Sequence, residues 1–79
     1  MLLPNKLYSY NESIISKFPG ILQILKRASF SVSELYRMVQ KDVTGVNEYI
    51  EILDCLYALN KIEFDEELEV LRYVVRNHE

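Results

Sequence analysis

The residues with the most reactive side chains are a single histidine, His78, and a single cysteine, Cys55. His78 stands one residue from the C-terminus, where fraying is expected, so it is poorly placed to act as a fixed general base. Cys55 falls in a helical pattern with no histidine nearby, which favours an inert buried thiol over a nucleophile. Neither residue indicates a catalytic centre.

Carboxylates are the other groups that could do chemistry, and they gather near the C-terminus at Glu63, Asp65, Glu66, Glu67 and Glu69. Their spacing lacks the ligand pattern and the turn glycine of a calcium loop, so a charged, solvated hairpin edge is the better interpretation. The chain also has no glycine-rich phosphate loop and no cysteine pair. We predict no catalytic residue, no metal site and no cofactor.

The charge is divided unevenly along the chain. Residues 1–41 carry six basic and two acidic residues, a net charge of +4, whereas residues 42–79 carry three basic and ten acidic residues, a net charge of −7. Such a chain suits partners of either sign on opposite faces, although a solvated surface is the simpler explanation. The lone cysteine and the lack of any apolar run near the roughly 18 residues of a membrane span predict a reduced, cytoplasmic setting.

One small domain over residues 1–79 must position these side chains, because a chain of this length has room for a single core. Residues 2–10 look extended, since Pro4 disfavours helical backbone at the residue before it, and this segment could add an edge strand to a sheet. Apolar residues at helical spacing follow, with Pro19 among them. They predict a short turn over 11–17 and a helix from about 18 to 28, or alternatively one kinked helix.

Two more helices and a hairpin are predicted from there on. Ser31 and Glu34 match a capping box, which starts a helix that ends near Lys41. A third helix ends at Asn60, and its apolar positions recur at three and four residues: Val46, Tyr49, Ile50, Leu53, Leu56 and Tyr57. Alternation over 61–75 predicts a β-hairpin. The sequence thus predicts an α+β domain, three helices followed by a C-terminal β-hairpin wing, which is the outline of a winged helix.

A winged helix that recognises DNA inserts its third helix in the major groove and needs basic or amide side chains near the start of that helix. Here the predicted third helix carries Glu48, Glu51 and Asp54 and no basic residue, so phosphate repulsion is expected and direct DNA contact by the isolated chain is not. The alternative, a small winged-helix transcriptional regulator acting as a homodimer, depends on the basic first half. Its candidate nucleic-acid residues are Lys26, Arg27, Arg37 and Lys41.

Several segments together resemble a known family. They are Leu3-Pro4-Asn5-Lys6, Glu12-Ser13-Ile14-Ile15, Ile21-Leu22-Gln23-Ile24-Leu25, Glu34-Leu35-Tyr36 and the run from Leu53 to Phe64. The chain resembles, from about residue 2 to 75, the small middle components of prokaryotic ABC-three-component systems, which are conflict or anti-phage operons of the Lamassu type.

This resemblance implies a winged-helix-like, non-catalytic subunit that joins an SMC-like ABC ATPase to an effector, often a nuclease. The family supplies no catalytic residues to transfer. Tyrosine is favoured where one end of a side chain is buried and the other meets a partner, and six tyrosines exceed what so small a core needs. Three of these tyrosines are not assigned to the predicted core. Together with residues of the N-terminal motif they form the predicted protein interface: Leu3, Pro4, Lys6, Tyr8, Tyr10 and Tyr73.

Overall fold

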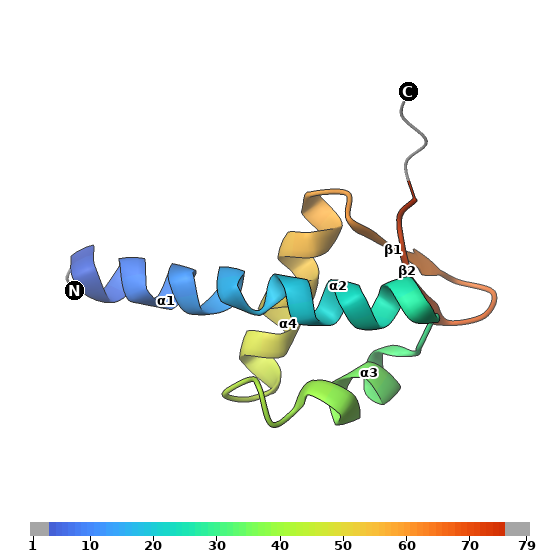
Figure 1. The fold of residues 1–79 in the computed structure, drawn as a ribbon, viewed down its shortest axis with the longest axis horizontal. Coiled ribbons are helices and arrows are strands. Elements are labelled where there is room, and N and C mark those ends of the chain that lie inside the picture. Colours follow the sequence, from blue (N-terminus) through green and yellow to red (C-terminus); the bar gives the residue numbers. More distant parts are fainter. Residues whose placement is uncertain (1–3, 76–79) are drawn as a thin grey trace.

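The structure is a computed structural model that describes residues 4–75, with side chains from residue 10 onward. Within these residues four helices precede an antiparallel hairpin: α1 (Pro4–Ser16), α2 (Phe18–Arg27), α3 (Val32–Val39), α4 (Val46–Ala58), β1 (Ile62–Asp65) and β2 (Val70–Tyr73). In Figure 1, α1 and α2 run nearly in line, α4 crosses them, and the hairpin lies near the far end of α2. The predicted α+β class, with three helices and then a hairpin, is confirmed as α2 to β2, and α1 is added before it.

The prediction of an extended edge strand over residues 2–10 is wrong for the residues described, because helix α1 begins at Pro4. A proline in the first turn of a helix loses no hydrogen bond, and it disfavours helix only at the residue before it. The predicted turn over 11–17 is also wrong, since α1 continues through most of it. The helix predicted from about 18 to 28 is confirmed as α2, with Pro19 in its first turn.

The residue that pairs with the hairpin comes from a part of the chain other than the edge strand predicted over residues 2–10. Phe30, between α2 and α3, forms a bridge with Leu71 of β2: each backbone N–H donates to the other's carbonyl, with N···O distances of 3.4 and 2.7 Å. On its other side β2 pairs with β1, with Ile62 opposite Tyr73. Within residues 4–75, the outer edge of β1 is therefore the sheet edge without a paired strand.

The predicted start of α3 is confirmed, and α4 ends two residues before the predicted Asn60. The Ser31 hydroxyl accepts the backbone N–H of Glu34 at 3.1 Å, and the Glu34 carboxylate accepts the backbone N–H of Ser31 at 3.0 Å, which completes a capping box at the start of α3. Helix α4 ends at Ala58, and Asn60 follows with a φ of 64°. Asparagine tolerates this left-handed conformation better than most residues, so it turns the chain into β1.

We expect Ser31→Ala to lower the free energy of unfolding by about 1 kcal/mol, because the first turn of α3 loses its side-chain cap. Urea unfolding followed by circular dichroism would measure the loss. Ser33→Ala is the matched control: Ser33 lies in the same turn, and its hydroxyl contacts the Ser31 hydroxyl at 3.3 Å but does not cap a backbone N–H. Its effect should stay within about 0.5 kcal/mol. Equal losses in the two variants would contradict the capping role.

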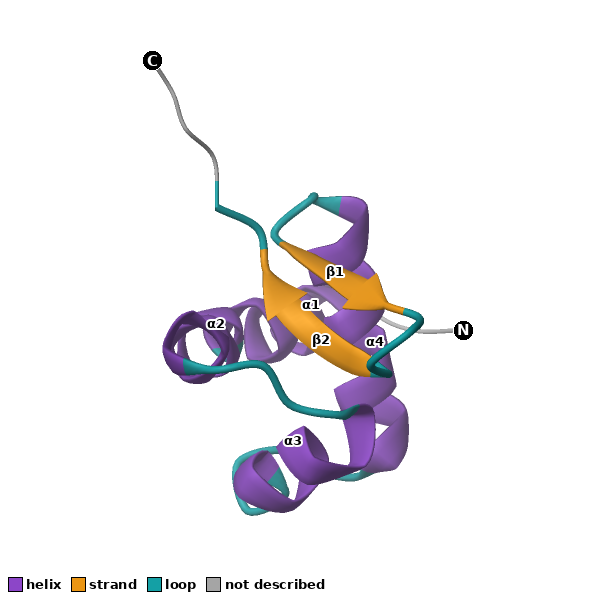
Figure 2. Ribbon diagram, turned by 90° about the vertical axis from the view of Figure 1, so that its right-hand side faces the viewer, coloured by secondary structure: helices purple, strands orange, loops and turns teal. Residues whose placement is uncertain are grey.

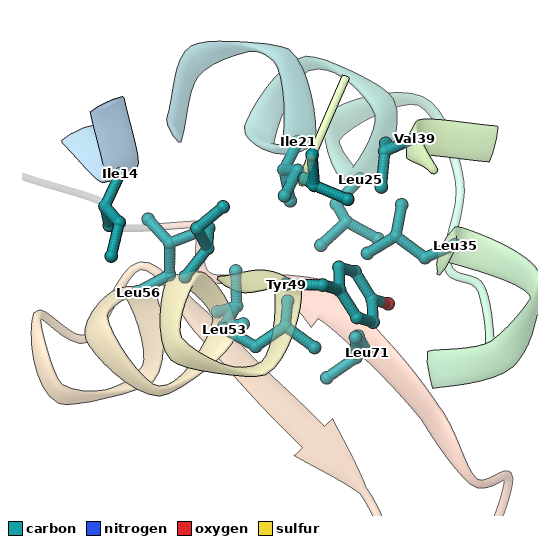
Figure 3. Close-up of a cluster of buried hydrophobic side chains, with 12 residues drawn as sticks. Ile14, Ile21, Leu25, Leu35, Val39, Tyr49, Leu53, Leu56 and Leu71 are labelled. Atoms are coloured by element: carbon teal, nitrogen blue, oxygen red, sulfur yellow. The ribbon is translucent and has the colours of Figure 1, made fainter. Parts of the chain in front are cut away.

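The core lies where the helices meet the hairpin, and Figure 2 shows the hairpin covering one side of α4. Side chains from all of the helices and both strands contribute to it. In Figure 3, Tyr49 lies between Leu35 of α3 and Leu71 of β2. The Tyr49 hydroxyl donates to the backbone carbonyl of Val32 at 2.6 Å, and burial raises the pKa of Tyr49 to about 12. The protonated phenol thus ties α4 to the start of α3.

Candidate protein-binding surface

Helix α4 has a broad apolar face, of which one part packs on the core and the adjoining part faces solvent. Its core side is formed by Tyr49, Ile52, Leu53 and Leu56. Its second apolar stripe faces solvent and consists of Val46, Ile50 and Tyr57, whose side chains are 54%, 42% and 64% exposed. A helix at the surface of a domain needs only one apolar face to pack on the core. The second stripe is therefore apolar surface that the core of the domain does not use.

A shallow groove runs beside this stripe, between α3, α4 and β1. It consists of two adjoining hollows that share Val32, Ile50 and Phe64. One hollow reaches Tyr36 and Val46, and the other reaches Tyr57. We call it the α4–β1 groove and define it by Val32, Tyr36, Val46, Ile50, Tyr57 and Phe64.

The rim of the α4–β1 groove is acidic. Asp54 and Glu69 line its two hollows, and neither hollow has a Lys or Arg among its described lining residues. Glu51 and Asp54 continue the acidic surface along α4, next to Ile50. An apolar floor beside carboxylates is complementary to apolar side chains that are flanked by Lys or Arg.

A second surface lies between α2 and the end of α3. Gly20 and Ile24 of α2 line a hollow there together with Lys17 and Val39. A neighbouring hollow on α2 is also lined by Gly20 and Ile24, with Lys26 and Arg27 beside them. The basic residues of α2 thus border a surface that lies mainly on α2, whereas the acidic groove lies mainly on α4 and β1; α3 contributes to both.

The predicted interface residues are distributed over several elements. Leu3 lies outside the described residues, and Pro4, Lys6 and Tyr8 lie in the first turns of α1. Tyr10 is exposed on α1, and its hydroxyl donates to a carboxylate oxygen of Glu51 on α4 at 2.5 Å, which raises the pKa of Tyr10.

Tyr73 is placed elsewhere, on β2 beside α2. The Lys26 ammonium lies 5.2 Å from the centre of the Tyr73 ring, within the range of a cation–π interaction. Tyr10 contacts α4 and Tyr73 contacts α2, so the two described tyrosines do not share a contact. The set as a single interface stays a prediction.

The predicted nucleic-acid residues lie at helix ends. Lys26 and Arg27 are in the last turn of α2, Arg37 is in the last turn of α3, and Lys41 follows α3. A cation near a helix C-terminus interacts favourably with the helix dipole. These positions therefore have a structural explanation that requires no DNA.

The residues of the α4–β1 groove were not recognised as a surface from the sequence. The helical pattern in the sequence includes Val46, Ile50 and Tyr57 together with the core residues of α4, because all of them recur at a spacing of three or four residues. A signal was present, since apolar residues cover more of the circumference of α4 than one buried stripe requires. The placement of α1 and the hairpin decides which part of this apolar circumference meets the core.

A small α+β domain with an uncovered apolar groove has the features of a protein-interaction module. The chain belongs to the family described as ABC-three component (ABC-3C) system Middle Component 7, whose model matches residues 3–71. Membership in a three-component system implies partner proteins, and it confirms the resemblance to middle components. Comparisons with curated proteins and with solved structures gave no match.

The described part of the chain lacks two kinds of feature, a membrane-spanning helix and a metal-binding cluster. Between residues 4 and 75, no helix combines the length and apolar character required to cross a membrane. Over the same range, no three His, Cys, Asp or Glu side chains lie close enough together to hold a metal ion.

Proposed function

We propose that this chain is a non-catalytic adaptor subunit that bridges an SMC-like ABC ATPase and an effector, often a nuclease, in a cytoplasmic, prokaryotic anti-phage defence complex of the Lamassu type. Membership in a middle-component family supports assembly with other components of such a system. We also propose that α2, α3, α4 and the hairpin form a winged-helix-like unit.

The observation that carries the adaptor proposal is the α4–β1 groove. Burial of apolar surface gains about 25 cal/mol per Å², and a contiguous exposed apolar patch with a polar rim is typical of a binding site. A bridging subunit needs a second surface as well. The hollow between α2 and α3 supplies one: Lys17 and Asp42 line it, and Lys26 and Arg27 border the neighbouring hollow on α2.

The transcriptional-regulator alternative has weaker support. The helix that would enter the major groove is α4, and its exposed side offers Glu51 and Asp54 beside apolar Val46, Ile50 and Tyr57. Carboxylates at this position repel phosphates, and an apolar stripe gives base edges few hydrogen-bond partners.

The adaptor proposal predicts that the three components of the system form a complex that depends on this chain. We expect tagged chain, co-expressed with the other two components, to retain both through affinity purification at moderate salt. In the matched experiment without this chain, a tag on either remaining component should no longer retain the other. Association of those two components in undiminished yield would contradict the bridging role.

A further inference from the structure

We infer that the α4–β1 groove receives an amphipathic α-helix with a basic border, supplied by a partner component. This inference rests on the proposed adaptor function and specifies which surface the partner uses. It is drawn from the direction of the apolar stripe on α4, the position of the open sheet edge and the charges on the rim.

The shape of the apolar surface favours a helix as the occupant. Val46, Ile50 and Tyr57 are separated by four and seven residues, so they form one stripe over three turns of α4. At about 1.5 Å per residue this stripe is about 16 Å long. A partner helix of similar length, with apolar residues at positions i, i+4, i+7 and i+11, would cover the stripe and place side chains between it and Phe64.

An added β-strand fits the same surface less well. A partner strand would pair along the outer edge of β1, where Ile62 and Phe64 point toward α4 and Glu63 points to the opposite face with Arg72. Such a strand would leave the Val46 end of the stripe on α4 exposed. The apolar surface follows α4 over its length, and β1 contributes only one wall.

The charge on the rim favours a basic partner over a second copy of this chain. Two copies related by a two-fold axis through the groove would bring two acidic rims together, and like charges in an interface oppose association. A helix bordered by Lys or Arg would pair with the same carboxylates. Residues 42–79, which supply most of the groove, have a net charge of −7 (three basic, ten acidic), and this adds a longer-range attraction.

The test measures the affinity of the purified full-length chain for each of the other two components, with variants of exposed residues. We expect Ile50→Ala and Tyr57→Ala to weaken binding to one component by about tenfold or more, as for central interface residues. Met38→Ala is the matched control, because Met38 on α3 is 46% exposed, similar to Ile50, and does not line the groove. It should change affinity by less than about twofold. Thermal unfolding checks that each variant keeps its fold.

The charge is tested separately with the double variant Asp54→Lys and Glu69→Lys. It should weaken binding to the same component by about tenfold at about 50 mM salt, and less at about 500 mM, because salt screens the lost attraction. A photo-crosslinking residue at position 57 then identifies what occupies the groove in the assembled complex. We expect a partner segment that has helical apolar spacing and a net positive charge.

The outcomes separate the inference from the proposed function. If both components bind the wild-type chain and the Ile50, Tyr57 and charge variants bind equally well, the adaptor role stands and the groove inference is overturned. Crosslinking to a second copy, to an extended segment or to an acidic segment also overturns the inference. If neither component binds the wild-type chain, the proposed function and the inference fail together.

Discussion

Leu56→Ala should lower the free energy of unfolding by about 2–5 kcal/mol, the range for removing a buried leucine side chain and leaving a cavity. Leu56 is 0% exposed on the core side of α4, and in Figure 3 its side chain points into the cluster between α1 and the hairpin. In a chain of about 70–80 residues or fewer, a single hydrophobic core rarely supplies more than about 3–5 kcal/mol of stability. We therefore expect this variant to be largely unfolded near 37 °C, which circular dichroism and urea titration at lower temperature would quantify.

Leu59→Ala is the matched control for this prediction. It makes the same chemical change three residues further on, where the leucine side chain is 56% exposed after the end of α4. Its expected cost is below about 1 kcal/mol, because little apolar surface leaves a packed environment. Similar losses in the two variants would show that α4 packs on the core through a different side from the one observed.

Helices α2 to α4 and the hairpin were predictable because local signals define them. The Ser31–Glu34 capping box starts α3, Asn60 ends α4, and the alternation at Ile62 and Phe64 marks β1. Each of these signals acts over a few residues and is independent of the packing around it. The order of these elements followed from the sequence alone.

The sequence does not predict helix α1, because Pro4 favours extended structure at the residue before it. A proline is compatible with both an extended segment and a helix that begins at that residue, and the sequence around it does not decide between the two. Contacts distant in sequence accompany the helix: the Tyr10 hydroxyl reaches Glu51 on α4, and Ile14 is buried in the core. Such contacts lie beyond any local pattern.

The candidate site was less predictable than the fold. The sequence predicts an acidic third helix, which argues against DNA binding. The exposed Glu51 and Asp54 of α4 agree with this prediction. The helical spacing alone does not show whether Ile50 and Tyr57 face the core or the solvent. Their exposure is decided by how α4 packs against α1 and against β1 of the hairpin.

Glu48 is a further case in which tertiary packing decides the environment of a side chain. The sequence placed it among the exposed acids of the third helix, but in the structure the side chain is only 4% exposed. Its carboxylate accepts hydrogen bonds from the Lys17 ammonium at 2.9 Å, the backbone N–H of Thr44 at 2.9 Å and the Ser13 hydroxyl at 3.3 Å. This network joins α1, the α1–α2 junction, the loop before α4 and α4 itself.

Glu48→Gln should therefore lower the free energy of unfolding by about 1.5–3 kcal/mol near neutral pH, the range for hydrogen bonds to charged groups. The larger cost of breaking a fully buried ion pair, about 3–5 kcal/mol, does not apply, because the Lys17 side chain is 20% exposed and can be hydrated. Glutamine preserves the shape of the side chain, so the loss reports the charge. Urea unfolding of the two proteins measures it.

The same network makes this loss depend on pH. The hydrogen bond from Lys17, followed by that from the Thr44 backbone N–H, lowers the pKa of Glu48 from its usual 4.5 in the folded protein. The unfolded chain then binds more protons on acidification, so the stabilisation by Glu48 is fully present above about pH 4.5 and is lost as the pH falls toward the lower folded pKa. We expect the difference between wild type and Glu48→Gln to be largest near pH 7 and to shrink near pH 3.

The measurement must separate the contribution of Glu48 to the pH dependence of stability from the contributions of other acidic residues. The backbone N–H of Leu68, followed by Arg72, lowers the pKa of Asp65 as well, but both proteins carry Asp65, so its contribution cancels in the difference between them. Glu12→Gln is the matched control, because Glu12 is exposed on α1 and its replacement should change the free energy of unfolding by less than about 0.5 kcal/mol. If the cost of Glu48→Gln were the same near pH 7 and near pH 3, the ionised carboxylate would not be what holds α1 and α4 together.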